Sequence, residues 1–212
     1  MRWPRALGLV GMALSVSPGC SKREPLVAFL GDSLTSGFKL PESQAYPAHV
    51  QRALRAQGRK LRVLNAGVSG DTVAQGLKRL PAVLRRRPDV LVVALGINDG
   101  LRGLAPEVTE VGLRQIITVA QGARVRVLLA GFRIPPARHG EEHARRFGEI
   151  YPRLAAEFRV PLVPDLLEGV GGQPALNFSD GLHPTADGQK RLAENVRPPL
   201  ELLLAEVDAA RR

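Results

Sequence analysis

"LVAFLGDSLTSGF", residues 26–38, places an apolar run of strand type directly before a small, polar Gly-Asp-Ser turn. Short runs rich in Val and Leu, without polar alternation, are typical of parallel strands that are covered on both faces. Two interpretations of the turn are open at this point. It is an ordinary strand-to-helix connection, or it holds the hydroxyl of Ser33 at the carboxyl edge of a sheet.

The rest of the chain repeats this strand-then-helix order. An alternation of this kind predicts an α/β fold, in which helices cover both faces of a parallel sheet. Ligands bind beyond the carboxyl ends of the strands in such sheets, so the polar residues that follow each strand are the candidates for a site. The expected strands are 26–31, 61–66, 90–96, 124–132 and 160–165, and the expected helices are 45–57, 72–87, 106–121, 141–158 and 185–207.

The composition is that of an ordinary globular chain. With 212 residues, 44% hydrophobic and 24% charged, it suits one domain with a sizeable core, which we place at residues 26–212. The net charge of +10 is carried largely by arginine. Because no zinc pattern, RNP motif or aromatic interleaving accompanies the basic residues, we expect no nucleic-acid partner. A surface that attracts anionic lipids or acidic substrates stays open.

The first twenty residues have the pattern of an export signal. A basic start, "MRWPR", precedes eleven apolar residues and then "SPGC", and the apolar run is short for a membrane span. Cys20 is the one cysteine, so no intrachain disulfide can form. Its position resembles a bacterial lipoprotein processing site, although Ser17 and Pro18 are unusual there. We predict a signal peptide over 1–20, a tether over 21–25, a periplasmic location and lipidation of Cys20 with membrane association. An incidental cysteine after a plain signal peptide is the alternative.

Small and polar residues follow every expected strand, as an esterase-type site would need. Ser33 follows the first strand, and the later ones are followed by "NAGVSGDT" at 65–72, "GIND" at 96–99, "FRIPPARHG" at 132–140 and "SDGLHP" at 179–184.

A serine is a poor nucleophile until a base takes its proton, and one of the four histidines has the right context. His183 follows Asp180 by three residues, which lets the carboxylate reach the Nδ1–H of the imidazole and leaves Nε2 for a hydroxyl. His49 lies in a helical pattern and is expected to be a surface or packing residue. His139 and His143 lie in an Arg-rich segment and are expected to be solvated.

The oxyanion that forms on attack needs preorganised hydrogen-bond donors. The backbone N–H groups of Ser33 and Gly70 and the side-chain amide of Asn98 could converge on it. Glycine suits an unusual turn at position 70, and Gly96 allows a sharp turn before Asn98. Taken singly, a turn or a cap explains each of these residues. Their order, each after a predicted strand, favours a site.

Four segments together resemble the sequence blocks of the GDSL/SGNH hydrolases: "GDSLTSG", "NAGVSGDT", "GIND" and "DGLHP". Residues 69–103 and 151–164 further resemble the multifunctional acyl-CoA thioesterase I, protease I and lysophospholipase L1 type, the arylesterases, within that family. The resemblance covers roughly residues 26–200. It implies a flavodoxin-like, three-layer α/β/α fold with five parallel strands. Ile97 stands where close relatives commonly have glycine, which we expect to change the lining of the pocket.

The resemblance also implies residue roles. It implies Ser33 as nucleophile, His183 as base and Asp180 as the group that orients the base, with Ser33, Gly70 and Asn98 as the oxyanion hole. We expect Asp32 to organise the loop without serving as the triad acid. The absence of a Gly-x-Ser-x-Gly elbow disfavours the larger α/β-hydrolase arrangement. The residues expected to contact substrate are Leu101, Ile134, Pro135 and Leu182.

The predicted function is hydrolysis of acyl esters, thioesters or lysophospholipids by a monomer, through a covalent acyl-enzyme. We expect neither cofactor nor metal, because the sequence lacks His and Cys ligand clusters. One alternative is a carbohydrate acetylesterase of the same superfamily. Two others are a non-catalytic surface lipoprotein and a flavodoxin-like cofactor binder, but the last would leave "GIND" and "DGLHP" without a role.

Overall fold

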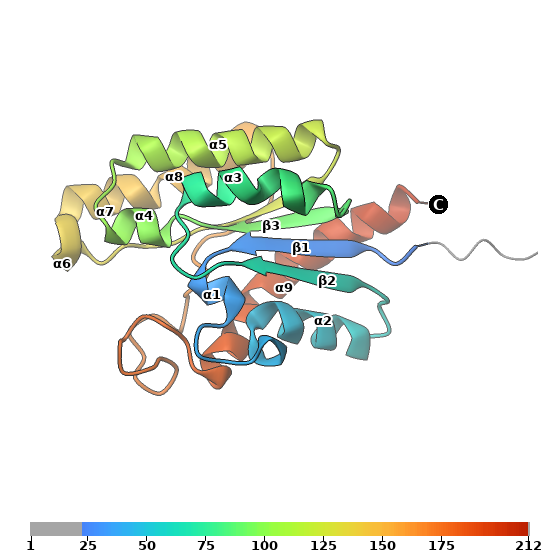
Figure 1. Ribbon diagram of the computed structural model, residues 1–212, viewed down its shortest axis with the longest axis horizontal. Coiled ribbons are helices and arrows are strands. Elements are labelled where there is room, and N and C mark those ends of the chain that lie inside the picture. Colours follow the sequence, from blue (N-terminus) through green and yellow to red (C-terminus); the bar gives the residue numbers. More distant parts are fainter. Residues whose placement is uncertain (1–22, 212) are drawn as a thin grey trace, which may run out of the picture.

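Five parallel strands form the central sheet, which a computed structural model shows for residues 23–211 (Figure 1). The predicted signal peptide, Cys20 and the start of the tether lie outside the described residues. The strands are ordered β2-β1-β3-β4-β5, and every neighbouring pair is parallel. Their bounds are β1 Leu26–Gly31, β2 Arg62–Gly67, β3 Val90–Ala94, β4 Arg126–Ala130 and β5 Leu162–Val163.

Helices cover both faces of this sheet, so the predicted three-layer α/β/α architecture is confirmed. Helices α2 and α9 lie on one face, and α3, α5 and α8 lie on the other (Figure 1). The helices are α1 Ser33–Ser36, α2 Tyr46–Ala56, α3 Val73–Leu84, α4 Ile97–Leu101, α5 Pro106–Gly122, α6 Pro136–His139, α7 Glu141–Gly148, α8 Ile150–Phe158 and α9 Ala186–Ala209, with a short 3-10 turn at Glu42–Gln44.

The core follows from the sequence pattern. Strands β1 and β3 are buried along their whole length, as expected of strands covered on both faces. In α5 the buried residues Leu113, Ile116, Ile117 and Ala120 recur at helical spacing and face the sheet. That helix begins at Pro106, whose fixed φ and missing N–H suit a first helical position.

Two expected elements are wrong in their extent. The helix expected over 141–158 is two helices, because α7 ends at Gly148 and α8 begins at Ile150. Glycine is a poor helix former, and only one residue of α7 is buried. The strand expected over 160–165 shrinks to Leu162–Val163, because prolines flank it at 161 and 164 and cannot donate to a sheet ladder. Helices α1, α4 and α6 were not expected.

The strand order places the candidate site. Chain connections leave β1 toward β2 on one side, whereas β3 lies on the other side of β1, so the order reverses between β1 and β3. A crevice forms outside the carboxyl ends of strands at such a switch point. Gly31 at the end of β1 pairs in register with Ala94 at the end of β3. The turns that begin with Asp32 and with Gly96 therefore lie next to each other.

Candidate active site

The Gly-Asp-Ser turn connects β1 to α1 in very little space. A Cβ atom on Gly31 would lie 2.0 Å from the Oγ1 of Thr35, so only glycine fits there. Asp32 is fully buried, and its Oδ1 accepts a hydrogen bond from the Leu34 N–H at 3.0 Å, which caps the short helix. Ser33 is thereby the first helical residue, with 7% of its surface exposed. Asp32 thus organises the turn, as predicted.

A chain of contacts joins the Ser33 hydroxyl to a histidine and a carboxylate. The Nε2 of His183 lies 3.0 Å from the Oγ of Ser33, and its Nδ1 lies 3.0 Å from the Oδ2 of Asp180. An ionised carboxylate only accepts hydrogen bonds, so Nδ1 carries the proton and Nε2 is left to accept one from the serine. The two ends of this chain are 150 residues apart in sequence.

Asp180 is held ionised by its own loop. The backbone N–H groups of His183 and Leu182 donate to Oδ1 of Asp180 at 2.9 and 3.0 Å. These two hydrogen bonds, with that from the imidazole, hold the pKa of Asp180 well below its usual range. The Nζ of Lys39 lies 3.7 Å from Oδ2 and adds a positive charge. The carboxylate therefore stays charged wherever the protein is folded near neutral pH.

The histidine loop is anchored at both ends. The Phe178 N–H donates to the carbonyl oxygen of His183 at 2.8 Å, and Asn177 forms an antiparallel bridge with Pro184. On the opposite side, the ring of Phe38 lies against the imidazole with 4.2 Å between ring centroids. The imidazole is thus held by contacts on several sides, which limits its rotation away from Ser33.

The three hydrogen-bond donors predicted for an oxyanion hole belong to the segments that follow the carboxyl ends of β1, β2 and β3. In the described part of the chain, the backbone N–H groups of Ser33 and Gly70 have no hydrogen-bond acceptor. The Nδ2 of Asn98 donates to the carbonyl oxygen of Asp71 at 3.0 Å, which brings this amide beside the residue that follows Gly70. A side-chain amide has two N–H groups, so one remains for a ligand.

Glycine is required at two positions of this arrangement. Gly70 has a φ of +82°, in the region that side chains with a Cβ rarely adopt. Gly96 has a φ of +119°, and a Cβ there would lie 2.3 Å from the hydroxyl of Tyr151. The unusual turn at position 70 and the sharp turn before Asn98 are both confirmed.

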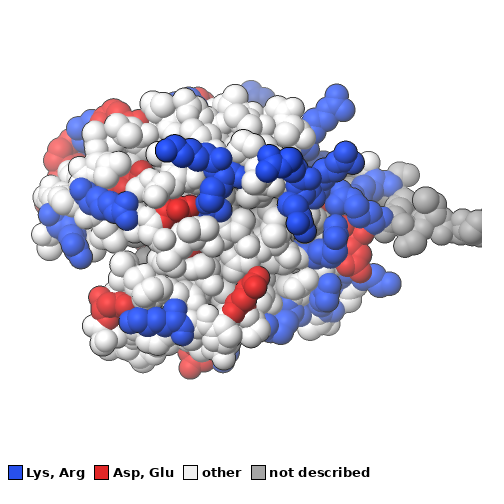
Figure 2. Space-filling view, in the orientation of Figure 1, with Lys and Arg blue, Asp and Glu red and all other residues white. Residues whose placement is uncertain are grey.

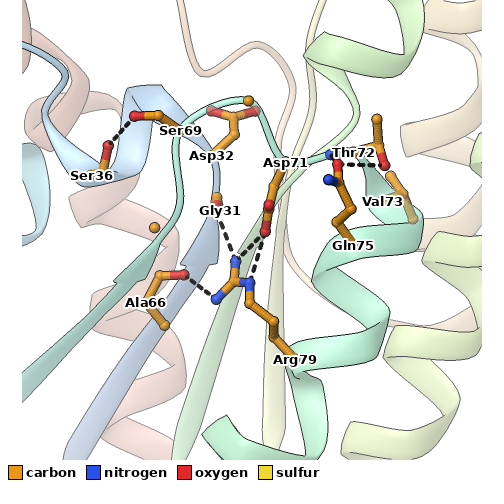
Figure 3. A network of polar contacts seen from close by, with 12 residues as sticks. Gly31, Asp32, Ser36, Ala66, Ser69, Asp71, Thr72, Val73, Gln75 and Arg79 are labelled. Atoms are coloured by element: carbon orange, nitrogen blue, oxygen red, sulfur yellow. Dashed lines mark hydrogen bonds and ion pairs between the residues drawn. The ribbon is translucent and has the colours of Figure 1, made fainter.

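Arg79 connects the Gly-Asp-Ser turn to the loop that carries Gly70 (Figure 3). Its guanidinium contacts the carboxylate of Asp71 at 2.7 Å and donates to the carbonyl oxygens of Ala66 at 2.9 Å and Gly31 at 3.3 Å. Gly31 ends β1, Ala66 lies near the end of β2, and Asp71 follows Gly70. One planar group therefore links the two strand ends to the loop, a geometry that suits the fixed fork of arginine.

Asp99 anchors the third segment of the site. Its side chain is buried, and Oδ2 accepts a hydrogen bond from the Val73 N–H at the start of α3 at 3.0 Å. Burial raises the pKa of Asp99. Burial also raises the pKa of Asp32, to about 7, with smaller contributions from the nearby charges of Asp71 and Asp99. The carboxylates of Asp32, Asp71 and Asp99 therefore each accept a hydrogen bond that fixes one of the segments after β1, β2 and β3.

A pocket with a volume of about 870 Å³ lies beside Asp180. All four residues predicted to contact substrate line it: Leu101, Ile134, Pro135 and Leu182. Ile97 also lines it. Asp180, Gly181 and Leu182, which directly precede His183 in the chain, belong to its lining and bring the pocket next to that residue. Within residues 23–211, no group of three or more His, Cys, Asp or Glu side chains is placed to hold a metal ion.

Comparison with known proteins identifies the family of the chain. Residues 29–191 match the model of the GDSL-like lipase/acylhydrolase family. The chain belongs to this family. It is 42% identical to esterase TesA of Pseudomonas aeruginosa, over 82% of this chain and 87% of the relative. It is also 42% identical to thioesterase 1/protease 1/lysophospholipase L1 of Escherichia coli, over 82% and 83% of the two chains.

A solved crystal structure of TesA superposes with a TM-score of 0.80 at 41% sequence identity, covering 84% of this chain and 99% of that one. The predicted family and fold are therefore confirmed, as is the enzyme class: the chain is a serine ester hydrolase of the GDSL family.

The other histidines of this GDSL-family hydrolase do not contact Ser33. The Nδ1 of His49 lies 2.9 Å from the guanidinium of Arg52. The Nε2 of His139 lies 3.1 Å from the carbonyl oxygen of Leu101, and its ring packs edge-on against His143 with 5.1 Å between centroids.

Several supporting residues carry no signal in the sequence of the hydrolase. Gln189 of α9 is fully buried; its Oε1 accepts from the Tyr46 N–H at 2.7 Å, and its Nε2 donates to the carbonyl oxygen of Leu34 at 3.1 Å. The hydroxyls of Thr35 and Tyr46 lie 3.0 Å apart. These contacts fix α1 against α2 and α9. The position of Gln189 in its helix would also suit a surface residue. Its burial can therefore be recognised only from the fold.

Proposed function

We propose that this protein hydrolyses carboxylic esters and thioesters by two-step acyl transfer through Ser33, His183 and Asp180. The observation that carries this proposal is the pair of 3.0 Å contacts that joins these three side chains. The arrangement matches the requirements for an activated serine, which are a hydroxyl, a base in contact with it and a group that orients the base.

In the first step, the Nε2 of His183 takes the proton of Ser33 while Oγ attacks the carbonyl carbon. The tetrahedral oxyanion is stabilised by the N–H groups of Ser33 and Gly70 and by the spare N–H of Asn98. His183 then gives its proton to the leaving alcohol or thiol as the carbon–oxygen or carbon–sulfur bond breaks. In the second step a water molecule attacks the acyl-enzyme by the same route, which releases the acid and restores Ser33.

The pocket supports an acyl chain of medium length as the bound part of the substrate. A volume of about 870 Å³ falls in the usual range for small-molecule sites, and much of its wall is apolar. Leu101, Ile134, Pro135 and Leu182 would contact the chain. An acetyl group would leave most of this space empty, which makes the carbohydrate acetylesterase alternative less favoured.

The proposed location is outside the cytoplasm, reached through the signal over residues 1–20, with Cys20 as the acceptor of a lipid. Among the described residues, no helix is long and apolar enough to cross a membrane. Globomycin inhibits the peptidase that processes lipoproteins, so accumulation of an unprocessed form on treatment would support lipidation of Cys20. Unchanged processing would favour the plain signal peptide.

Hydrolysis of p-nitrophenyl esters with acyl chains from two to sixteen carbons tests this function. The wild type should reach its highest kcat/KM at medium chains, and Ser33→Ala should lose essentially all activity. Ser43→Ala is the matched control, because Ser43 is exposed on a short turn away from the triad. Full activity in Ser33→Ala would overturn the proposal. A sharp preference for acetate would favour the acetylesterase, and a folded but inactive wild type would favour a binding role.

A further inference from the structure

The end of the molecule opposite the site carries an unusual concentration of positive charge. It is formed by the segments that lead into the strands and by both ends of the described chain, and we refer to it as the amino-edge face. Its basic residues are Arg23, Arg55, Arg59, Lys60, Arg62, Arg85, Arg86, Arg87, Arg124, Arg126, Arg159 and Arg211, and its acidic residues are Glu24, Asp89, Glu206 and Asp208.

This face holds the whole excess of positive charge in the described chain. Its twelve basic and four acidic residues give a net charge of +8. The other described residues include fourteen basic and sixteen acidic ones, so the remainder is slightly negative. Figure 2 shows blue side chains crowding the end at which the described chain begins, whereas blue and red mix at the opposite end. The charge is therefore placed at one end and is not a uniform property of the surface.

Much of this charge is exposed and unmatched. Some of the arginines pair with carboxylates, as Arg23 does with Asp89 at 3.0 Å and Arg59 with Asp208 at 3.2 Å. Seven others are exposed and have no carboxylate partner within residues 23–211. These seven are Lys60, Arg62, Arg85, Arg86, Arg87, Arg124 and Arg159.

Three of these arginines occupy backbone positions that favour glycine. Arg87, Arg124 and Arg159 have φ values of 53°, 59° and 52°, at the ends of α3, α5 and α8. Glycine or asparagine usually takes this left-handed position after a helix, because a Cβ is strained there. The corresponding position after α2 is indeed Gly58, with a φ of 82°. Arginine is thus found three times where it is less stable than glycine, always on the same face, which indicates a use for its charge.

We propose that the amino-edge face docks this protein onto a membrane surface of anionic lipids. The described chain begins at Arg23 within this face, three residues after Cys20, so a lipid on that cysteine would lie within about 10 Å of it. This step rests on the lipid proposed for Cys20: such a lipid would hold the chain at the bilayer beside this face, and the basic cluster would then turn the face toward anionic headgroups. Exposed arginines without carboxylate partners are well suited to lipid phosphates.

The orientation leaves the candidate active site open. Ser33 lies beyond the carboxyl end of β1, and the amino-edge face lies at the other end of that strand. A strand of six residues spans roughly 20 Å. Docking through the amino-edge face would therefore point the pocket away from the lipid surface, and it requires no change in the site.

Binding of the full-length chain to vesicles tests the proposal. Vesicles of phosphatidylglycerol mixed with phosphatidylcholine are compared with vesicles of phosphatidylcholine alone, at low and high salt. The key variant is R87G/R124G/R159G, which removes three charges and relieves three strained positions. The control is K78Q/K190Q/R191Q, which removes three exposed charges outside the face. A duplex DNA titration at the same salt examines nucleic acid as the other anionic partner.

We expect binding to the anionic vesicles only, weakening with salt. Each basic residue near such a surface contributes about fivefold in partitioning, so the glycine variant should bind on the order of 100-fold less tightly. The same variant should melt at a higher temperature than the wild type, which excludes unfolding as the cause of the loss. The control variant should bind like the wild type.

Three results would overturn the proposal. Equal binding to both kinds of vesicle would show that an apolar segment, and not the charge of the amino-edge face, attaches the protein. Equal losses in the glycine and control variants would show that net charge alone matters. Tighter binding to the DNA duplex than to the vesicles would make nucleic acid the partner.

Discussion

Asp32 and the seven unpaired basic residues of the amino-edge face are all ionisable groups without an oppositely charged partner in the described chain, yet their surroundings differ completely. Asp32 is fully buried within the Gly-Asp-Ser turn, and its Oδ2 has no hydrogen-bond partner among the described residues. Arg85 and Arg86 lie in water at the other end of the sheet. Burial penalises the charged form of the first, whereas water solvates the second.

The two ends of the sheet therefore differ in how well they tolerate substitutions. At the carboxyl edge, side chains are held at fixed distances by several partners, as Arg79 and Asp180 are, so each substitution should be felt in activity or stability. At the amino edge the arginines are replaceable one at a time, because their stability contribution is small and their use is collective.

Asp32→Asn should change how stability depends on pH. Burial raises the pKa of Asp32 from 3.8 to about 7. Between these values the folded chain binds a proton that the unfolded chain has released, so the free energy of unfolding falls as pH rises. Asparagine cannot ionise and can still accept from the Leu34 N–H. Between pH 4 and pH 8 the wild type should therefore lose on the order of 4 kcal/mol of unfolding free energy relative to Asp32→Asn.

Urea unfolding at both pH values measures this difference. Asp208→Asn is the control, because that side chain is 40% exposed and pairs with Arg59 at the surface, where such pairs contribute about 1 kcal/mol or less. Parallel pH profiles of Asp32→Asn and wild type would show that Asp32 is not penalised by burial.

Asn98→Ala should lower kcat by about 10²–10³, because it removes one preorganised donor to the oxyanion. KM for a p-nitrophenyl ester should change much less, since the amide acts on the transition state. Steady-state kinetics beside a urea unfolding curve would separate this effect from a loss of fold. A kcat within threefold of wild type, from folded protein, would remove Asn98 from the oxyanion hole.

Arg79→Met should lower kcat by roughly 10- to 100-fold, because the strand ends and the Asp71 loop lose their common link and the donors shift. Arg79→Lys should fall between methionine and wild type, since an ammonium can reach Asp71 but cannot span both carbonyls. Steady-state kinetics that separate kcat from KM, together with a melting curve, measure this effect. A variant that melts earlier but keeps its kcat would make Arg79 a purely structural residue.

Arg85→Gln combined with Arg86→Gln should leave the free energy of unfolding within about 0.5 kcal/mol of wild type, because both side chains are exposed and unpaired in the described chain. Activity on a soluble ester should also be unchanged. A loss of more than 2 kcal/mol would show that these arginines support the fold, and the contrast between the two ends of the sheet would fail.

Much of the fold and the site could be predicted from the sequence. The non-alternating apolar runs indicated a parallel sheet, and motifs after the first, second, third and fifth strands predicted a site formed by Ser33, Gly70, Asn98 and His183. The carboxyl ends of parallel strands meet at one edge, so residues far apart in the chain had to converge there. The three-residue spacing from Asp180 to His183 further predicted a contact that the structure has.

Other features depend on tertiary neighbours. Arg79 lies on a helix among other basic residues, where a surface role is the natural interpretation, and only the fold places its guanidinium below two strand ends. Gln189 carries no local sign of burial. The break between α7 and α8 follows from a single glycine that many helices would tolerate, so the pattern over 141–158 predicted one helix.

The central claim, that Ser33 is a nucleophile activated by His183, is tested most directly by a fluorophosphonate, which labels activated serines. Mass spectrometry of the labelled protein would locate the adduct. We predict one adduct, on Ser33, that is absent from Ser33→Ala and forms far more slowly in His183→Ala. Labelling of another residue, or labelling of His183→Ala at the wild-type rate, would contradict the account.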